Sequence, residues 1–309
     1  MAKPVWRRPR ALAGTFVIAL ALALAVWAIS EQWHVVVETV RSIGVATLAL
    51  SALFGTLATA VLLPMWRVIL EGLGVTLPLR SAARVFYVSQ LGKYVPGSVW
   101  PALLQMEAGR QVGATKRTML AANLITLALS CAVGLIVAAV LLPFAHSRAL
   151  GHYWWALVAL PFLLALLHPR SIPGLMNWLL TKLGRDPFDA RVDGRSLMIA
   201  ALWSLVSWVL FGVQLGLLCN AASPHGFHTY VVTTGAMALA VCAGILFIPA
   251  PAGVGVRDAV LVLILSILMS PGAALGVAIT ARVAIVIGDL LLAGVGALVR
   301  HRPPATAGS

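Results

Sequence analysis

The sequence predicts an all-α polytopic membrane protein with seven to nine transmembrane segments and two broken or re-entrant segments. The first reason is composition, because 61% of the 309 residues are hydrophobic and only 10% are charged, whereas soluble domains average about 25% charged residues. The second is that the apolar residues form runs of about 20, the length of a helix that crosses the hydrocarbon core. The third is that prolines and glycines interrupt two stretches, 85–104 and 247–258.

Seven apolar runs have the length of a membrane helix. A shorter apolar segment, Ala259–Met269, follows the second interruption, and the segment Val85–Leu104 contains the first one and either spans or re-enters. The number of crossings therefore lies between seven and nine. The seven runs are Leu12–Ser30, Ile43–Leu63, Met119–Leu142, Tyr153–Leu167, Leu197–Cys219, Thr229–Ile248 and Ala274–Val299.

We expect one integral membrane domain, residues 1–309, built from two halves. Residues 1–168 form the first half and residues 197–299 the second, and each contains one interrupted segment, a pattern typical of transporters. Residues 169–196 form the longest polar loop and carry charges of both signs, which predicts a cytoplasmic linker. The polar tail, residues 300–309, is expected to be disordered.

The basic residues predict a cytoplasmic N-terminus in the plasma membrane. Lys and Arg gather on the cytoplasmic side of short loops, and four basic residues lie among the first ten. If Val85–Leu104 re-enters, the opposite side of the membrane receives only Arg41 and Arg148 from the basic loops, and this asymmetry favours re-entry. The net charge of +13 then reflects topology and attraction to anionic lipid headgroups. Nucleic-acid binding is not expected, because no soluble domain carries a basic face.

The first interrupted segment places a cation beside a bend. Lys93 and Tyr94 lie just before Pro96 and Gly97, in otherwise apolar sequence. A charge at membrane depth is costly unless it is paired or hydrated, so Lys93 is a candidate ligand for an anionic headgroup such as phosphate. The alternative is that Lys93 extends to the interface, with Tyr94 among the aromatic residues that lie there.

The second interrupted segment also combines bends with charges. Backbone amides freed by the glycines, together with a guanidinium, suit a phosphate-sized anion. Two simpler explanations stay open, since glycine bends also serve close helix packing and an acidic residue favours a helix start. The candidate residues are Pro249, Pro251, Gly253, Gly255, Arg257 and Asp258.

The last run carries two further charges, Arg282 and Asp289, which lie seven residues apart on one helical face. They are explained by a structural ion pair, formed directly or through Lys93 or Arg257. Alternatively, Asp289 changes its protonation during a transport cycle. Arg110 and Glu107 follow the first interrupted segment at a spacing that fits an interfacial pair.

The sequence contains no motif of a known catalytic centre. It lacks the GxSxG, HExxH and GxxxxGK[ST] patterns, and its three cysteines stand alone in apolar runs. We therefore expect no catalytic residue, no metal site and no cofactor.

The two interrupted segments resemble those of the lysylphosphatidylglycerol synthase transmembrane-region family. The resemblance covers about Arg41 to Val299 and depends mainly on Gln90–Trp100, followed by Gly109 and Arg110, and on Pro249–Asp258. The second family motif usually reads Pro-x-Pro-Gly-Gly-x-Gly-x-x-Glu. Here Ala252 replaces a glycine and Asp258 replaces the glutamate, while Arg282 matches an arginine of the family's late span.

The resemblance implies a lipid flippase that moves a lipid or lipid-linked intermediate with an anionic headgroup between leaflets. Lipid lysylation is not expected, because the aminoacyltransferase domain of the synthases is not part of this sequence. The expected partner is a phospholipid or a polyprenyl-phosphate-linked lipid. One alternative is a membrane subunit or enzyme of lipid-linked glycosyl or aminoacyl transfer. Another is an accessory protein with a partner in envelope biosynthesis.

Overall fold

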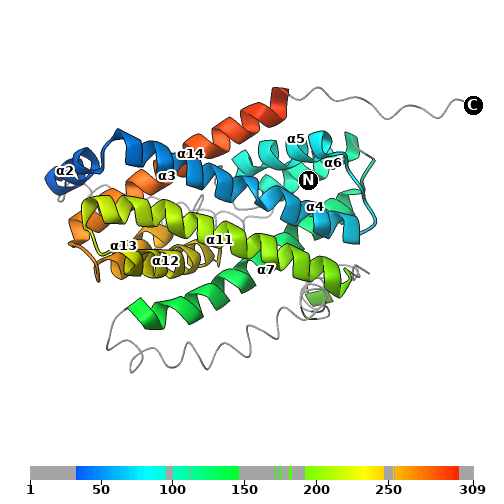
Figure 1. The fold of residues 1–309 in the computed structure, drawn as a ribbon. Coiled ribbons are helices and arrows are strands. Elements are labelled where there is room, and N and C mark those ends of the chain that lie inside the picture. Colours follow the sequence, from blue (N-terminus) through cyan, green and yellow to red (C-terminus); the bar gives the residue numbers. More distant parts are fainter. Residues whose placement is uncertain are drawn as a thin grey trace, which may run out of the picture.

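The computed structural model describes residues 33–94, 100–111, 113–145, 192–246 and 255–298, with the isolated positions 171, 174, 181, 182 and 253. This part of the chain is all-α and contains no strand, which confirms the predicted fold class (Figure 1). The elements are α2 (Trp33–Ile43), α3 (Val45–Ala60), α4 (Leu62–Gly72), α5 (Leu79–Gln90), the 3-10 helix η2 (Leu91–Tyr94), α6 (Trp100–Gln111), α7 (Lys116–Leu141), the 3-10 helix η3 (Leu142–Ala145), α11 (Gly194–Ala222), α12 (Phe227–Leu246), α13 (Val256–Leu265) and α14 (Pro271–Leu298).

Five helical segments of the described part are long and apolar enough to cross a membrane. They correspond to five of the seven predicted runs. The other two, Leu12–Ser30 and Tyr153–Leu167, lie outside the described residues, as do most of the linker 169–196 and the tail 300–309. The total of seven to nine crossings therefore stays a prediction. The five segments are Val45–Gly72, Lys116–Phe144, Gly194–Ala222, Phe227–Leu246 and Pro271–Leu298.

The first of these segments extends beyond its predicted end at Leu63, because α4 follows α3 after a single residue, Val61. Pro64 lies in the first turn of α4 and has no N–H to donate to the carbonyl of Ala60. The hydroxyl of Tyr87 donates to that carbonyl at 3.0 Å. The proline is therefore accommodated, since a side chain from α5 satisfies the carbonyl that it leaves free.

Polar side chains cap the first turns of α7 and α11, and a proline begins α14. The Thr115 side chain accepts a hydrogen bond from the N–H of Thr118 at the start of α7. Asp193 does the same for the N–H of Ser196 at the start of α11. At α14, Pro271 occupies the first helical position, where its missing N–H costs nothing.

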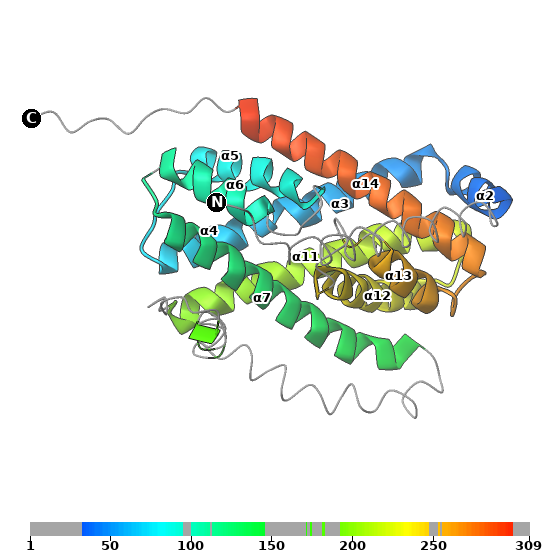
Figure 2. The same cartoon turned by 180° about the vertical axis from the view of Figure 1, so that it is seen from behind.

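The helices of the two predicted halves pack against one another. Helix α11 contacts α3, α4 and α7 of the first half as well as α12 and α14 of the second. Figures 1 and 2 both show α11 through the middle of the bundle, with α14 on one side of it and α7 on the other.

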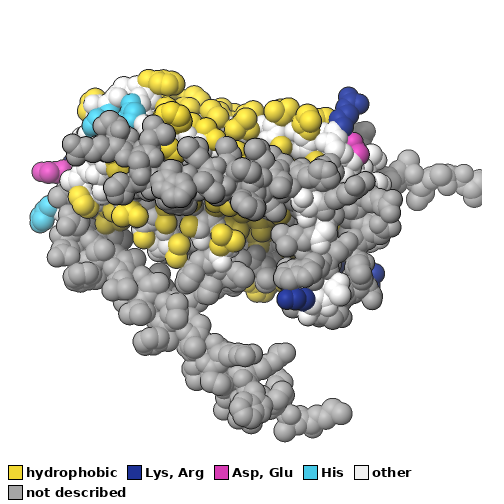
Figure 3. Space-filling model, turned by 90° about the horizontal axis from the view of Figure 1, so that it is seen from below, with side chains coloured by type: hydrophobic (Ala, Val, Ile, Leu, Met, Phe, Trp, Pro, Cys, Tyr) yellow, Lys and Arg dark blue, Asp and Glu magenta, His cyan; other side chains and the backbone are white. Residues whose placement is uncertain are grey.

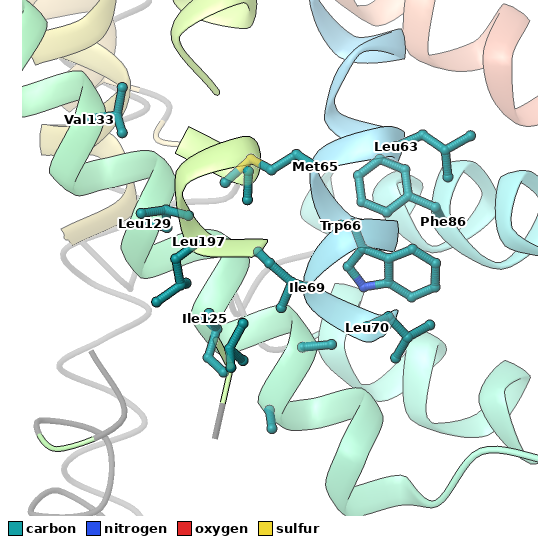
Figure 4. Packing of buried hydrophobic residues seen from close by; sticks show 14 of the residues in the cluster. Leu63, Met65, Trp66, Ile69, Leu70, Phe86, Ile125, Leu129, Val133 and Leu197 are labelled. Carbon is teal, nitrogen blue, oxygen red and sulfur yellow. The ribbon is translucent and has the colours of Figure 1, made fainter. Parts of the chain in front are cut away.

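A core of large side chains lies where α4, α5, α7 and α11 meet (Figure 4). Trp66 of α4 and Phe86 of α5 are buried, with ring centroids 5.5 Å apart. Ile125 of α7 and Leu197 of α11 are buried in the same cluster. Lipid is as apolar as these side chains, so such a core stabilises the bundle mainly through close packing.

Charge and hydrophobicity separate along the molecule. Where Figure 3 shows described residues, hydrophobic side chains lie between the two ends of the molecule, Lys and Arg lie toward one end, and His lies toward the other. This is the pattern of a bundle whose middle faces lipid and whose ends face water. The described basic residues that are exposed are Arg41, Arg80, Arg84, Arg110, Lys116, Arg117, Lys182 and Arg195.

Candidate functional site

The first interrupted segment is held by a close backbone contact. Helix α5 ends at Gln90, η2 covers Leu91–Tyr94, and α6 begins at Trp100. A methyl group at Gly92 would lie 2.8 Å from the backbone nitrogen of Pro101 and 2.9 Å from the carbonyl carbon of Trp100. Only glycine permits this approach between η2 and the start of α6. The contact fixes the position of the two residues that follow Gly92.

Those two residues, Lys93 and Tyr94, both bind Asp289 of α14. The Lys93 ammonium lies 2.7 Å from Oδ2 of Asp289, and the Tyr94 hydroxyl donates to the same oxygen. The Asp289 side chain is completely buried, whereas that of Lys93 is 30% exposed. The second carboxylate oxygen of Asp289, Oδ1, has no hydrogen-bond partner.

The second interrupted segment is held by glycines as well. Gly253 adopts a φ of +68°, and a methyl group on it would lie 2.8 Å from the Cα of Gly244 in α12. Gly255 follows with a φ of +87°, directly before α13 begins. Left-handed backbone favours glycine, and the contact with Gly244 leaves no room for a side chain. Gly253 and α13 therefore pack closely against α12.

Asp258 links the second segment to α14. Its Oδ2 accepts a hydrogen bond of 3.2 Å from the N–H of Gly255, as predicted for an acidic residue at a helix start. Its Oδ1 lies 2.9 Å from Nη2 of Arg282, and both side chains are 22% exposed. Asp258 thus caps α13 and forms an ion pair with α14.

Helix α14 presents one charge to each interrupted segment. Arg282 pairs with Asp258 of the second segment and Asp289 with Lys93 of the first. Seven residues separate Arg282 from Asp289, which is about 10 Å along a helix. The structure pairs Asp289 with Lys93, a partner that the sequence leaves open, and it pairs Arg282 with Asp258, a partner that the sequence analysis does not name.

Arg257 has no carboxylate partner in the part of the chain that the structure describes. Its Nη2 lies 3.4 Å from the sulfur of Met237, a weak acceptor, and its Nε is buried without a hydrogen-bond partner. Tyr94, Asp258, Arg282 and Asp289 all lie within electrostatic range of its guanidinium. Arg257 is therefore a cation beside two ion pairs, Lys93–Asp289 and Arg282–Asp258. We call these six residues, Lys93, Tyr94, Arg257, Asp258, Arg282 and Asp289, the charge cluster.

The comparison with protein families matches residues 12–293 to the family described as lysylphosphatidylglycerol synthase TM region. The chain belongs to this family. It is accordingly a membrane protein related to lipid handling, as the sequence motifs predict. No curated protein matches the chain.

In this lysylphosphatidylglycerol synthase transmembrane-region protein, the predicted site residues Gly253 and Gly255 lie beside the cluster, and the remaining ones lie apart from it or outside the described chain. Arg110 forms an exposed group with Glu107, at 3.6 Å, and Glu107 also lies 3.8 Å from Lys116. The predicted pair of Glu107 and Arg110 is thus confirmed. The predicted residues outside the described chain are Pro96, Gly97, Pro249 and Pro251.

Sequence reasoning missed two residues of α12 that shape the site of this family member, Met237 and Gly244. Both lie in an apolar run with no charge nearby in sequence. The weak signal for Gly244 was a small residue in a membrane helix, which is typical of close helix contacts. No sequence feature indicated that Met237 would contact Arg257.

Proposed function

We propose that this protein is a lipid flippase whose charge cluster binds the anionic headgroup of a lipid. The acyl chains would stay in the membrane while the headgroup crosses beside the two interrupted segments. Membership of a family related to lipid handling supports this function. The assignment of the headgroup site to the charge cluster depends on Arg257.

The observation that supports the site is an excess cation in a largely buried cluster. Lys93 and Arg282 each form an ion pair with a carboxylate, whereas the described hydrogen bond of the Arg257 guanidinium goes to the sulfur of Met237. An ionised group that is largely removed from water is costly unless it is paired. An anionic headgroup would supply the missing charge, and guanidinium suits phosphate because it donates two parallel hydrogen bonds.

We also propose that α5 and α6 form a re-entrant pair that brings Lys93 to this headgroup. Each helix has 12 residues, and crossing the hydrocarbon core takes about 20. The two helices contact each other. Arg84 of α5 and Arg110 of α6 are both exposed and basic, as expected if the pair begins and ends on the cytoplasmic side.

The test is movement of an acyl-labelled phosphatidylglycerol between leaflets of liposomes that contain the purified protein. We expect wild-type protein to accelerate this movement, and Arg257→Gln to slow it by about tenfold or more, given the cost of an unpaired charge at membrane depth. The control is Arg195→Gln, which removes an exposed cation at the start of α11. Equal rates for wild type and folded Arg257→Gln would refute the site.

A further inference from the structure

We propose that the charge cluster selects a singly charged phosphodiester lipid over a doubly charged phosphomonoester. This inference rests on the flippase function proposed above and names the substrate class of the same site. It follows from the number of charges in the cluster and from how they are paired.

The charges of the cluster are counted over the residues that the structure describes. Residues 90–100 contain one ionisable cation, Lys93, and residues 247–265 contain Arg257 and Asp258. Helix α14 contributes Arg282 and Asp289 and no other charge. Three cations and two carboxylates leave a single positive charge.

The pairing locates this positive charge on Arg257. Asp289 is occupied by Lys93 at 2.7 Å, and Asp258 by Arg282 at 2.9 Å. One negative charge at Arg257 would therefore make the whole cluster neutral. A second negative charge would have to compete with Asp258 or Asp289 for a cation that is already paired.

That competition is unfavourable because the pairs are shielded from water. The Asp289 side chain is completely buried, and the side chains of Asp258 and Arg282 are each 22% exposed. Removing the partner of a buried ion leaves an uncompensated charge in a medium of low dielectric constant. A dianion would thus create one uncompensated negative charge wherever it bound in the cluster.

The phosphate groups of lipids differ in how many negative charges they carry. A phosphodiester bears one negative charge at neutral pH, whereas a phosphomonoester approaches two charges above its second pKa of about 6. The cluster matches the first class. The same charge count predicts that removing one carboxylate would admit the second class.

The experiment compares acyl-labelled phosphatidylglycerol, a phosphodiester, with acyl-labelled phosphatidic acid, a phosphomonoester, in the same proteoliposomes at pH 8. Rates are taken above those of protein-free liposomes. We expect wild-type protein to move phosphatidylglycerol faster by about tenfold or more, since an unpaired charge at membrane depth is costly.

The Asp258→Asn variant raises the charge of the cluster by one and should shift the preference toward phosphatidic acid. Its matched control is Glu107→Gln, which removes a carboxylate from the exposed group of Glu107, Arg110 and Lys116 and should leave the preference unchanged. If Asp258→Asn does not fold, the wild-type comparison carries the test.

The outcomes separate the two proposals. Equal protein-dependent rates for the two lipids would overturn the selectivity and leave the flippase function standing. The selectivity is also overturned, and the flippase function left standing, if folded Asp258→Asn shifts the preference between the two lipids no more than Glu107→Gln does. If the protein moves neither lipid, both the flippase function and the selectivity are overturned.

Discussion

Lys93 and Asp289 form an ion pair of 2.7 Å that joins the first interrupted segment to α14, and the Tyr94 hydroxyl donates to the same carboxylate oxygen. Seven residues before Asp289, Arg282 joins the second interrupted segment to the same helix through Asp258. Helix α14 therefore binds both interrupted segments, the first through the negative charge of Asp289 and the second through the positive charge of Arg282.

Loss of Lys93 should strongly destabilise the protein, because Asp289 is completely buried and would lose the cation that binds it. We expect Lys93→Met to lower the free energy of unfolding by about 3 kcal/mol. The double variant Lys93→Met, Asp289→Leu should recover most of this loss, since the buried carboxylate is removed together with its partner. The measurement is thermal unfolding in detergent. A double variant as unstable as Lys93→Met would contradict the ion pair's role.

Loss of Arg257, unlike loss of Lys93, should not destabilise the protein. Its Nε is buried without a partner and it has no carboxylate in the described chain, so Arg257→Met should keep or raise the unfolding temperature while abolishing lipid movement. Such a gain in stability with a loss of activity is typical of functional sites. The comparison is Arg282→Met, which removes the cation bound to Asp258. This variant should lower both the unfolding temperature and the rate of lipid movement. If Arg257→Met destabilised the protein as much as Arg282→Met, Arg257 would be a structural residue.

Gly253 should tolerate alanine poorly for two reasons, its φ of +68° and its contact with Gly244. The left-handed backbone alone costs an alanine about 1–2 kcal/mol. Gly226 separates these causes, because it has a φ of +65° with nothing within 4 Å of an added methyl group. We expect Gly253→Ala to lower the unfolding temperature more than Gly226→Ala does. Equal effects would show that the contact with α12 is unimportant for stability.

The start of α11 should be sensitive to acid. Hydrogen bonds from the side chain and the N–H of Ser196 hold the pKa of Asp193 below its ordinary value of 3.8. The carboxylate therefore stabilises the folded state above that value, and the contribution is lost as the pH falls through the lower folded pKa.

The check is the difference in unfolding temperature between wild type and Asp193→Ala, which should be present at pH 7 and shrink toward pH 3. Thr115→Ala at the start of α7 provides the control, because its hydroxyl cap does not ionise in this range. A difference for Asp193→Ala that does not change with pH would refute this assignment.

Much of the fold follows from local sequence. Hydropathy located the five described spans to within a few residues at most ends, because a membrane helix satisfies its own backbone and needs only apolar side chains. The exception was the run that begins at Ile43, which continues through Pro64 to Gly72. The Ala60 carbonyl that Pro64 leaves free accepts a hydrogen bond from Tyr87, which lies on another helix. Hydropathy contains no information about such a contact.

The candidate site, too, could be predicted from the sequence only in part. The sequence by itself determined that the protein lies in a membrane, where its two interrupted segments fall, and which charges lie in these segments and in the last run, since hydropathy and proline act locally. Only the tertiary structure decided that Asp289 binds Lys93, that Asp258 binds Arg282 and that Arg257 lacks a carboxylate among the described residues. Ion pairs between distant segments depend on how helices pack, and five charges allow several pairings of similar energy until packing selects one.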